Sequence, residues 1–173
     1  GNTTADNIRT GYTLNGTNLS NIGSVLTSTT GGTAAIVGIR CTATGSLISI
    51  TSNTLRGIAT SGTTTAVTGI TTSGTLTGTP TVAVNNNFIG TATLGWIRYA
   101  FANSGTLTGI STTNTIAVIN EIKNNDFQGI VYGVTGSGSH TYINLTGATA
   151  TGNAASITGN TFTNLNVNTT GSV

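Results

Sequence analysis

Side-chain carboxylates are the groups in this chain that could act as general acids or bases, and the sequence contains three of them: Asp6, Glu121 and Asp126. Hydrolysis of a glycosidic bond needs two such groups, one on each side of the bond. Glu121 and Asp126 are close enough in sequence to face each other across a turn. A local charge pair with Lys123 on a solvated turn explains the same residues more simply. We therefore predict no catalytic residues and no enzyme activity.

His140 and Cys41 are the other residues whose types could bind a metal ion or act as a nucleophile. No Cys, Asp or Glu lies near His140 in the sequence, so neither a metal site nor a catalytic triad is indicated. Cys41 is the single cysteine, which excludes a disulfide framework. We expect His140 to lie in a loop and Cys41 to be a small buried side chain, and we expect no metal and no cofactor.

The segment 94–101 is the strongest candidate for a specific contact because its aromatic residues surround an arginine. In an extended strand, one face would carry Trp96, Arg98 and Ala100, and the other would carry Ile97, Tyr99 and Phe101. An exposed Trp96 beside Arg98 could stack on a sugar ring or on a neighbouring subunit, although packing in the core is the favoured alternative. Trp96, Arg98 and Tyr99 are the possible contact residues, and this segment is a candidate loop in the longest repeat.

The composition limits the classes of partner. Charged residues make up 5% of the 173 residues, against about 25% in typical soluble domains, and the arginines are scattered along the sequence. No basic cluster suited to nucleic acid is present, and no apolar run approaches the roughly 18 residues of a membrane span. Hydrophobic residues at 36% argue against disorder. Thr, Val and Ile favour extended backbone, while the 25 Gly and the many Asn favour turns.

A short phrase recurs along the chain and indicates one repeat domain spanning residues 1–173. It consists of an apolar residue, two variable positions, an Asn, one further variable position and a large apolar residue, and it starts near residues 14, 50, 83, 122 and 157. Between these phrases, short stretches alternate apolar and polar residues, with Gly-rich breaks between them. A period of 33 to 39 residues with about three short strands and no helical pattern is typical of a coil of a parallel β-helix or of a hairpin stack in an all-β sandwich or propeller.

The recurring Asn favours a parallel β-helix over a β-propeller or a sandwich. In stacked coils about 4.8 Å apart, Asn residues at one tight turn can adopt the left-handed conformation and pass side-chain hydrogen bonds from coil to coil. The sequence predicts an all-β parallel β-helix of about five coils with Gly/Thr-rich turns. The predicted ladder comprises Asn53, Asn86, Asn125 and Asn160, with Asn87 replacing Asn86 if that alignment is one residue off. The predicted interior residues are Ile50, Leu55, Phe88, Ile122, Phe127, Ile157 and Phe162.

The phrase resembles the right-handed parallel β-helix repeats of secreted bacterial surface proteins of the adhesin type, and the segment 160–171 is especially similar to them. This resemblance covers most of residues 14–173 and is specific for architecture rather than function, because pectin-cleaving enzymes, phage tailspikes, adhesins and structural fibres share the fold. The long period departs from the usual pattern and implies wide coils or coils with loops.

The function expected from these features is that of a structural or adhesive subunit or segment of an extracellular surface fibre, assembling by end-to-end stacking of coils. The expected partner is another copy of the chain or neighbouring repeats, with a surface polysaccharide as a second possible partner. A polysaccharide- or ice-binding module remains an alternative. It ranks second because the threonine runs at 63–65, 71–72 and 112–113 share no obvious register. A carbohydrate-cleaving enzyme is the least favoured class.

Overall fold

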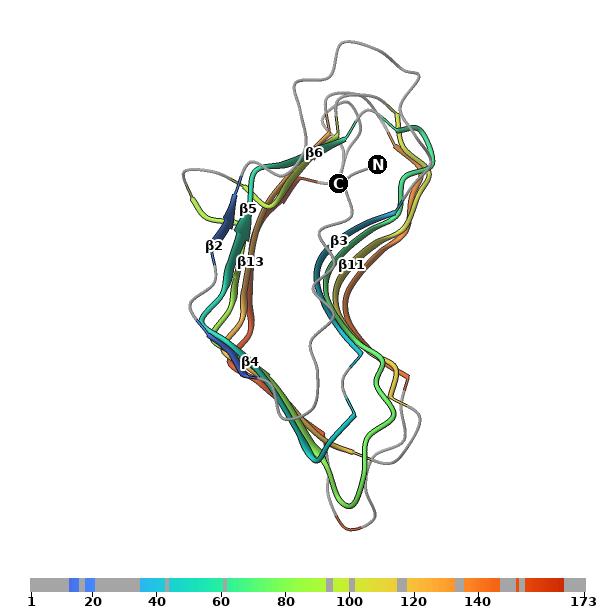
Figure 1. The fold of residues 1–173 in the computed structure, drawn as a ribbon. Coiled ribbons are helices and arrows are strands. Elements are labelled where there is room, and N and C mark those ends of the chain that lie inside the picture. Colours follow the sequence, from blue (N-terminus) through green and yellow to red (C-terminus); the bar gives the residue numbers. More distant parts are fainter. Residues whose placement is uncertain are drawn as a thin grey trace.

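The computed structural model shows a β-solenoid in which parallel strands stack around an elongated interior (Figure 1). The structure describes residues 13–15, 18–20, 35–42, 44–60, 62–92, 95–99, 102–114, 118–132, 136–146, 152 and 155–166. Every strand pairing among these residues is parallel, and each turn of the solenoid passes through three sheets, which we name A, B and C. The predicted all-β parallel β-helix is therefore confirmed.

Each sheet takes its strands from successive turns. Sheet A has the order β1 (Thr13–Asn15), β4 (Leu47–Thr51), β8 (Thr81–Asn85), β12 (Ile119–Lys123) and β15 (Ser156–Thr158). Sheet B contains β2 (Asn18–Ser20), β5 (Thr54–Arg56), β9 (Phe88–Ile89), β13 (Asp126–Tyr132), β10 (Ile97–Tyr99), β6 (Ile58–Thr60) and β16 (Thr161–Asn166). Sheet C has the order β14 (His140–Leu145), β11 (Leu107–Thr112), β7 (Val67–Thr72) and β3 (Ile36–Cys41).

The number of turns is slightly lower than the predicted five. Four consecutive turns, beginning at β1, β4, β8 and β12, have described strands in all three sheets, and the first of them has strands of only three residues in sheets A and B. Strands β15 and β16 follow in sheets A and B. The described chain thus shows about three central turns, with a turn of short strands before them and a partial turn after them.

The register of sheet A corrects the predicted start of the third repeat. Val84, not Ala83, pairs with Ile50 on one side and with Ile122 on the other. The shift by one residue brings Ile89 into register with Leu55 and places Phe88 opposite Thr54. Ile89 is buried, whereas Phe88 is 49% exposed. The prediction that Phe88 faces the interior was therefore wrong, because a strand shifted by one residue presents its opposite set of side chains.

The other predicted interior residues of the middle turns form the core. Ile50, Leu55, Ile122 and Phe127 are all buried, as expected from their place in the phrase. Ile157 and Phe162 stand in the same columns, in register with Ile122 and Phe127, but they are 46% and 47% exposed because they belong to the last described turn. The periodic pattern thus predicted their column but not their burial.

A column of glycines lets sheets B and C approach each other across the interior. Gly38, Gly69 and Gly109 are each the third residue of a strand of sheet C, and these strands curve toward sheet B (Figure 1). A Cβ atom on Gly69 would lie 2.6 Å from the carbonyl oxygen of Gly109 and 3.3 Å from the Trp96 ring, and a Cβ on Gly109 would overlap the Phe127 ring. Glycine at these positions therefore leaves room for the large side chains of sheet B.

Candidate functional site

Asparagine side chains connect successive turns at the corner between sheets A and B. The Oδ1 atom of Asn87 accepts hydrogen bonds from the backbone N–H of Asn53 at 3.0 Å and from its Nδ2 at 2.9 Å. The same pair of bonds runs from Asn87 to Asn125, at 3.0 and 2.9 Å, and from Asn125 to Asn160, both at 2.9 Å. A hydrogen-bonded amide ladder therefore runs along the solenoid.

The ladder asparagines that follow Asn53 in the sequence also donate hydrogen bonds to the backbone of the preceding turn. The Nδ2 atoms of Asn87, Asn125 and Asn160 donate to the carbonyl oxygens of Ile50, Val84 and Ile122, respectively, at 2.8 to 2.9 Å. In Asn125, both Nδ2 hydrogens are donated and Oδ1 accepts two hydrogen bonds. A buried amide paired in this way avoids the cost of desolvated, unpaired polar atoms.

The ladder differs from the prediction in two respects. Asn87 occupies the place assigned to Asn86, which is exposed on the outer side of the same turn. In addition, the left-handed residue is the one before each ladder Asn: φ is 56° at Ser52, 57° at Asn86, 55° at Asn124 and 66° at Gly159. This left-handed residue interrupts the alternation of faces, so that the next residue, the ladder Asn, points inward.

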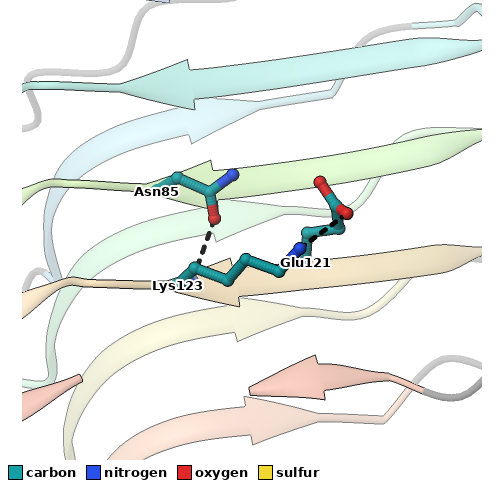
Figure 2. A network of polar contacts seen from close by, with 3 residues as sticks. All are labelled: Asn85, Glu121 and Lys123. Atoms are coloured by element: carbon teal, nitrogen blue, oxygen red, sulfur yellow. Dashed lines mark hydrogen bonds and ion pairs between the residues drawn. The ribbon is translucent and has the colours of Figure 1, made fainter. Parts of the chain in front are cut away.

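The acidic residues predicted to be non-catalytic lie on the outer surface and are paired. Lys123 Nζ donates to Glu121 Oε1 at 2.8 Å, and the backbone N–H of Lys123 donates to Asn85 Oδ1 at 2.9 Å (Figure 2). The charge pair therefore lies within strand β12 rather than on the expected solvated turn, and both side chains are about one-third exposed. Asp126, at the start of β13, accepts hydrogen bonds from Thr161 Oγ1 at 2.7 Å and from Gln128 Nε2.

The proposed aromatic contact group is divided between the core and the surface. Trp96 and Tyr99 are fully buried, and only Arg98 of the three is exposed. The Trp96 ring packs against the Phe127 ring with 6.4 Å between their centroids. Trp96 and the adjacent Ile97 are both buried because the chain bends at Trp96, before strand β10 begins. The alternation of inward and outward side chains starts only at Ile97. An exposed surface formed by Trp96 and Arg98 is thus not present, and Ile97–Tyr99 is a strand rather than a loop.

His140 and Cys41 are both structural positions in sheet C. Cys41 is buried, as predicted. His140 begins strand β14 in register with Leu107, which corrects its expected place in a loop, and its ring makes an edge contact with Tyr142. Burial lowers the pKa of His140 below its ordinary value of 6.5 and raises the pKa of Tyr142. Within the described residues, no three His, Cys, Asp or Glu side chains are grouped to hold a metal ion.

The last described turn presents side chains that are covered in the turns below it. The Phe162 ring stacks on the Phe127 ring, with 5.0 Å between centroids and an interplanar angle of 6°. Tyr142 packs edge-on against Phe162 at 5.5 Å. Asn160 is the last residue of the described ladder. Its backbone N–H and Nδ2 are equivalent to the Asn125 donors that bind the Oδ1 atom of the next ladder Asn. Apolar columns and ladder donors therefore meet at the same end of the solenoid.

The outer face of sheet B carries an exposed aromatic residue that the sequence reading missed. Phe88 lies between Thr54 and Asp126 in the register of the sheet. The signal that could have revealed it is the choice between Asn86 and Asn87 as the ladder residue, because that choice decides whether Phe88 or Ile89 faces inward.

The geometry defines the chain as a β-solenoid with an internal amide ladder, and comparisons with protein-family models, curated proteins and solved structures found no match. Across the part of the chain that the structure describes, no helix has the length and apolar character needed to cross a membrane. Function is therefore inferred from the residues that the solenoid exposes.

Proposed function

We propose that this chain is a structural subunit or segment of an extracellular surface fibre whose turns stack end to end. The observation that carries the proposal is the last described turn, where Ile157 and Phe162 are nearly half exposed although they continue columns that are fully buried below. An equivalent turn of a neighbour would extend these columns and cover about half the surface of each side chain. Burial of apolar surface contributes roughly 25 cal/mol per Å².

Backbone and amide hydrogen bonds would fix the direction and register of this contact. The strands of the last turn are parallel to those below, so a neighbouring turn in the same orientation would add one more strand to each sheet. The ladder position of that turn would need a hydrogen-bond acceptor to meet the donors of Asn160. A head-to-tail contact of this kind is heterologous and extends into a filament unless it closes into a ring.

The sparse charge of the chain supports the same proposal. Only 5% of the residues are charged, so repulsion between copies is weak. The contact would rest on apolar columns and hydrogen bonds rather than on ion pairs, and assembly should therefore persist as salt screens surface charges.

Threonine rows give the binding-module alternative less support. Thr72 and Thr112 do share a register, which corrects the expectation that these runs do not align, but both side chains are buried. Thr68, Thr108 and Thr141 form a row on sheet C, but Val37 takes the corresponding place on β3. A short row of this kind is a weaker feature than the exposed end columns.

The test is sedimentation velocity and negative-stain microscopy of the purified chain at micromolar concentrations in low and high salt. We expect elongated assemblies at both salt concentrations, and we expect Phe162→Asp to prevent them by placing a charge in the contact. Leu47→Asp is the matched control, because Leu47 is also 47% exposed but lies on the outer face of sheet A, away from the end. A compact monomer in all conditions, or equal loss of assembly in both variants, would overturn the proposal.

A further inference from the structure

Phe88 is a large aromatic side chain on a sheet face that is otherwise mostly polar. In its row, the neighbouring strands carry Thr54, Asp126 and Thr161. Phe88 is 49% exposed, whereas Trp96, Tyr99 and Phe127 are fully buried. The exposed ring therefore offers a flat apolar surface among polar neighbours, against which a partner with an apolar face could pack.

Two polar residues lie diagonally from Phe88 on the neighbouring strands, on the same outer face. Arg56 lies two residues after Thr54 on β5, and Gln128 lies two residues after Asp126 on β13. The Asp126 carboxylate is already engaged by Thr161 and Gln128. Among the described residues, Arg56 forms no ion pair, and its buried Nε makes no hydrogen bond. Arg56, on the same outer face as Phe88, therefore retains its capacity to bind an anionic group.

The chain leaves sheet B shortly after Phe88. It departs at Gly90, where φ is 96°, and returns at Gly95, whose carbonyl oxygen accepts a hydrogen bond from the backbone N–H of Gly57 at 2.8 Å. Figure 1 shows the yellow-green chain projecting outward from the sheet at this point. Strand β9, which carries Phe88, ends at Ile89, directly before the chain leaves the sheet.

We propose that Phe88, Arg56 and Gln128 form a binding subsite for one ring of an acidic, carboxylate-bearing polysaccharide. The Phe88 ring would pack against the apolar C–H face of the sugar. Arg56 would bind the carboxylate through charge-assisted hydrogen bonds, for which the guanidinium geometry is suited. The Gln128 amide would hydrogen-bond to a sugar hydroxyl.

A second copy of this chain fits this surface less well than an acidic sugar. The sequence holds three Asp and Glu residues, and the two that the structure describes, Glu121 and Asp126, are already paired. Another copy therefore offers Arg56 few carboxylates. A single exposed ring also matches one sugar unit, whereas a stable protein interface buries about 800 Å² per partner.

The test is isothermal titration calorimetry of the full chain with a mannuronate hexasaccharide, a cellohexaose of the same length, and polyglutamate. We expect the mannuronate to bind more tightly than the neutral cellohexaose and more tightly than polyglutamate, which lacks sugar rings. Phe88→Ala should weaken mannuronate binding about tenfold through loss of the aromatic platform. Arg56→Gln should weaken it about fivefold or more and bring it close to the cellohexaose affinity, with a smaller dependence on salt.

Two matched variants separate this site from general surface effects. Leu47→Ala removes an apolar side chain of nearly equal exposure from sheet A, and Arg98→Gln removes an exposed guanidinium from sheet B beyond the projection. Both should leave mannuronate binding unchanged. No measurable binding, equal binding of polyglutamate, or equal weakening by the control variants would overturn the proposal. Thermal unfolding of each variant checks that these surface changes leave the fold intact, and Phe162→Asp should not alter the affinity.

Discussion

Two corners of the solenoid place asparagine side chains in its interior, and their hydrogen bonding differs. At the corner between sheets A and B, the amide of Asn125 is fully paired. At the corner between sheets C and A, Asn114 donates to Thr72 Oγ1 and Asn120 accepts from Thr112 Oγ1, both at 3.3 Å. The Oδ1 of Asn114 and the Nδ2 of Asn120 have no hydrogen-bond partner among the described residues.

The difference follows from what each Asn meets in the neighbouring turns. Above and below the Asn125 side chain lie other asparagines, so that donors meet acceptors in every turn. Asn120 instead shares its row with Val82 and Ile48, which cannot form side-chain hydrogen bonds. A buried amide thus stabilises a solenoid when the repeat supplies the same amide in the next turn, and it costs desolvation energy when the repeat does not.

Replacement of Asn125 by Ala should have the largest effect on the free energy of unfolding. The change leaves two buried donors of Asn87 without an acceptor and frees the Val84 carbonyl, and each unpaired buried group costs about 1 to 3 kcal/mol. We expect a loss of roughly 4 to 6 kcal/mol, measured by urea unfolding. A loss below about 1 kcal/mol would show that the ladder contributes little beyond its neighbours' packing.

Replacement of Phe127 by Ala tests the apolar column next to the ladder. Phe127 is buried and contacts Trp96, Tyr142 and Phe162. We expect a loss of about 3 to 5 kcal/mol, the usual range for a large buried aromatic residue. The same urea experiment with Phe162→Ala is the control and should show a smaller loss in the unassembled chain, since Phe162 is nearly half exposed. An unchanged urea midpoint for Phe127→Ala would contradict the role of Phe127 in a buried apolar column.

Replacement of Asn120 by Val should have a far smaller effect than removal of Asn125. Valine continues the row formed by Ile48 and Val82 and removes an unpaired buried Nδ2, at the cost of the acceptor used by Thr112. We expect a change within about 1 kcal/mol, with stabilisation as the favoured direction. Equal destabilisation by Asn120→Val and Asn125→Ala would remove the contrast between the two corners.

The pH dependence of stability should be the smallest effect and should not involve either corner. Burial lowers the pKa of His140, so between its folded pKa and 6.5 the unfolded chain binds more protons than the folded chain. The contribution of neutral His140 to the free energy of unfolding should therefore be fully present above pH 6.5, and it should decrease as the pH falls through this window. Urea midpoints between about pH 7.5 and 5 measure the slope, and His140→Gln should remove it. A slope of opposite sign would contradict the burial of the neutral imidazole.

Much of the fold could be predicted because the repeat encodes it locally. The recurring apolar and Asn positions predicted the parallel β-helix, the ladder residues Asn53, Asn125 and Asn160, and the buried column containing Leu55 and Phe127. A repeat makes such inference possible because each turn must present the same residue types to the turns above and below it.

Tertiary structure decided what depends on contacts between strands distant in sequence. Three successive Asn residues at 85–87 fit the phrase in two ways, and only the pairing of Val84 with Ile50 and Ile122 placed Asn87 inside and Phe88 outside. The bend at Trp96 buried its side chain, although the alternation of a strand predicted that Trp96 and Arg98 would share one face. The exposure of Phe162 likewise depends on its place in the last described turn, because Phe127 in the same column is buried where a further turn covers it.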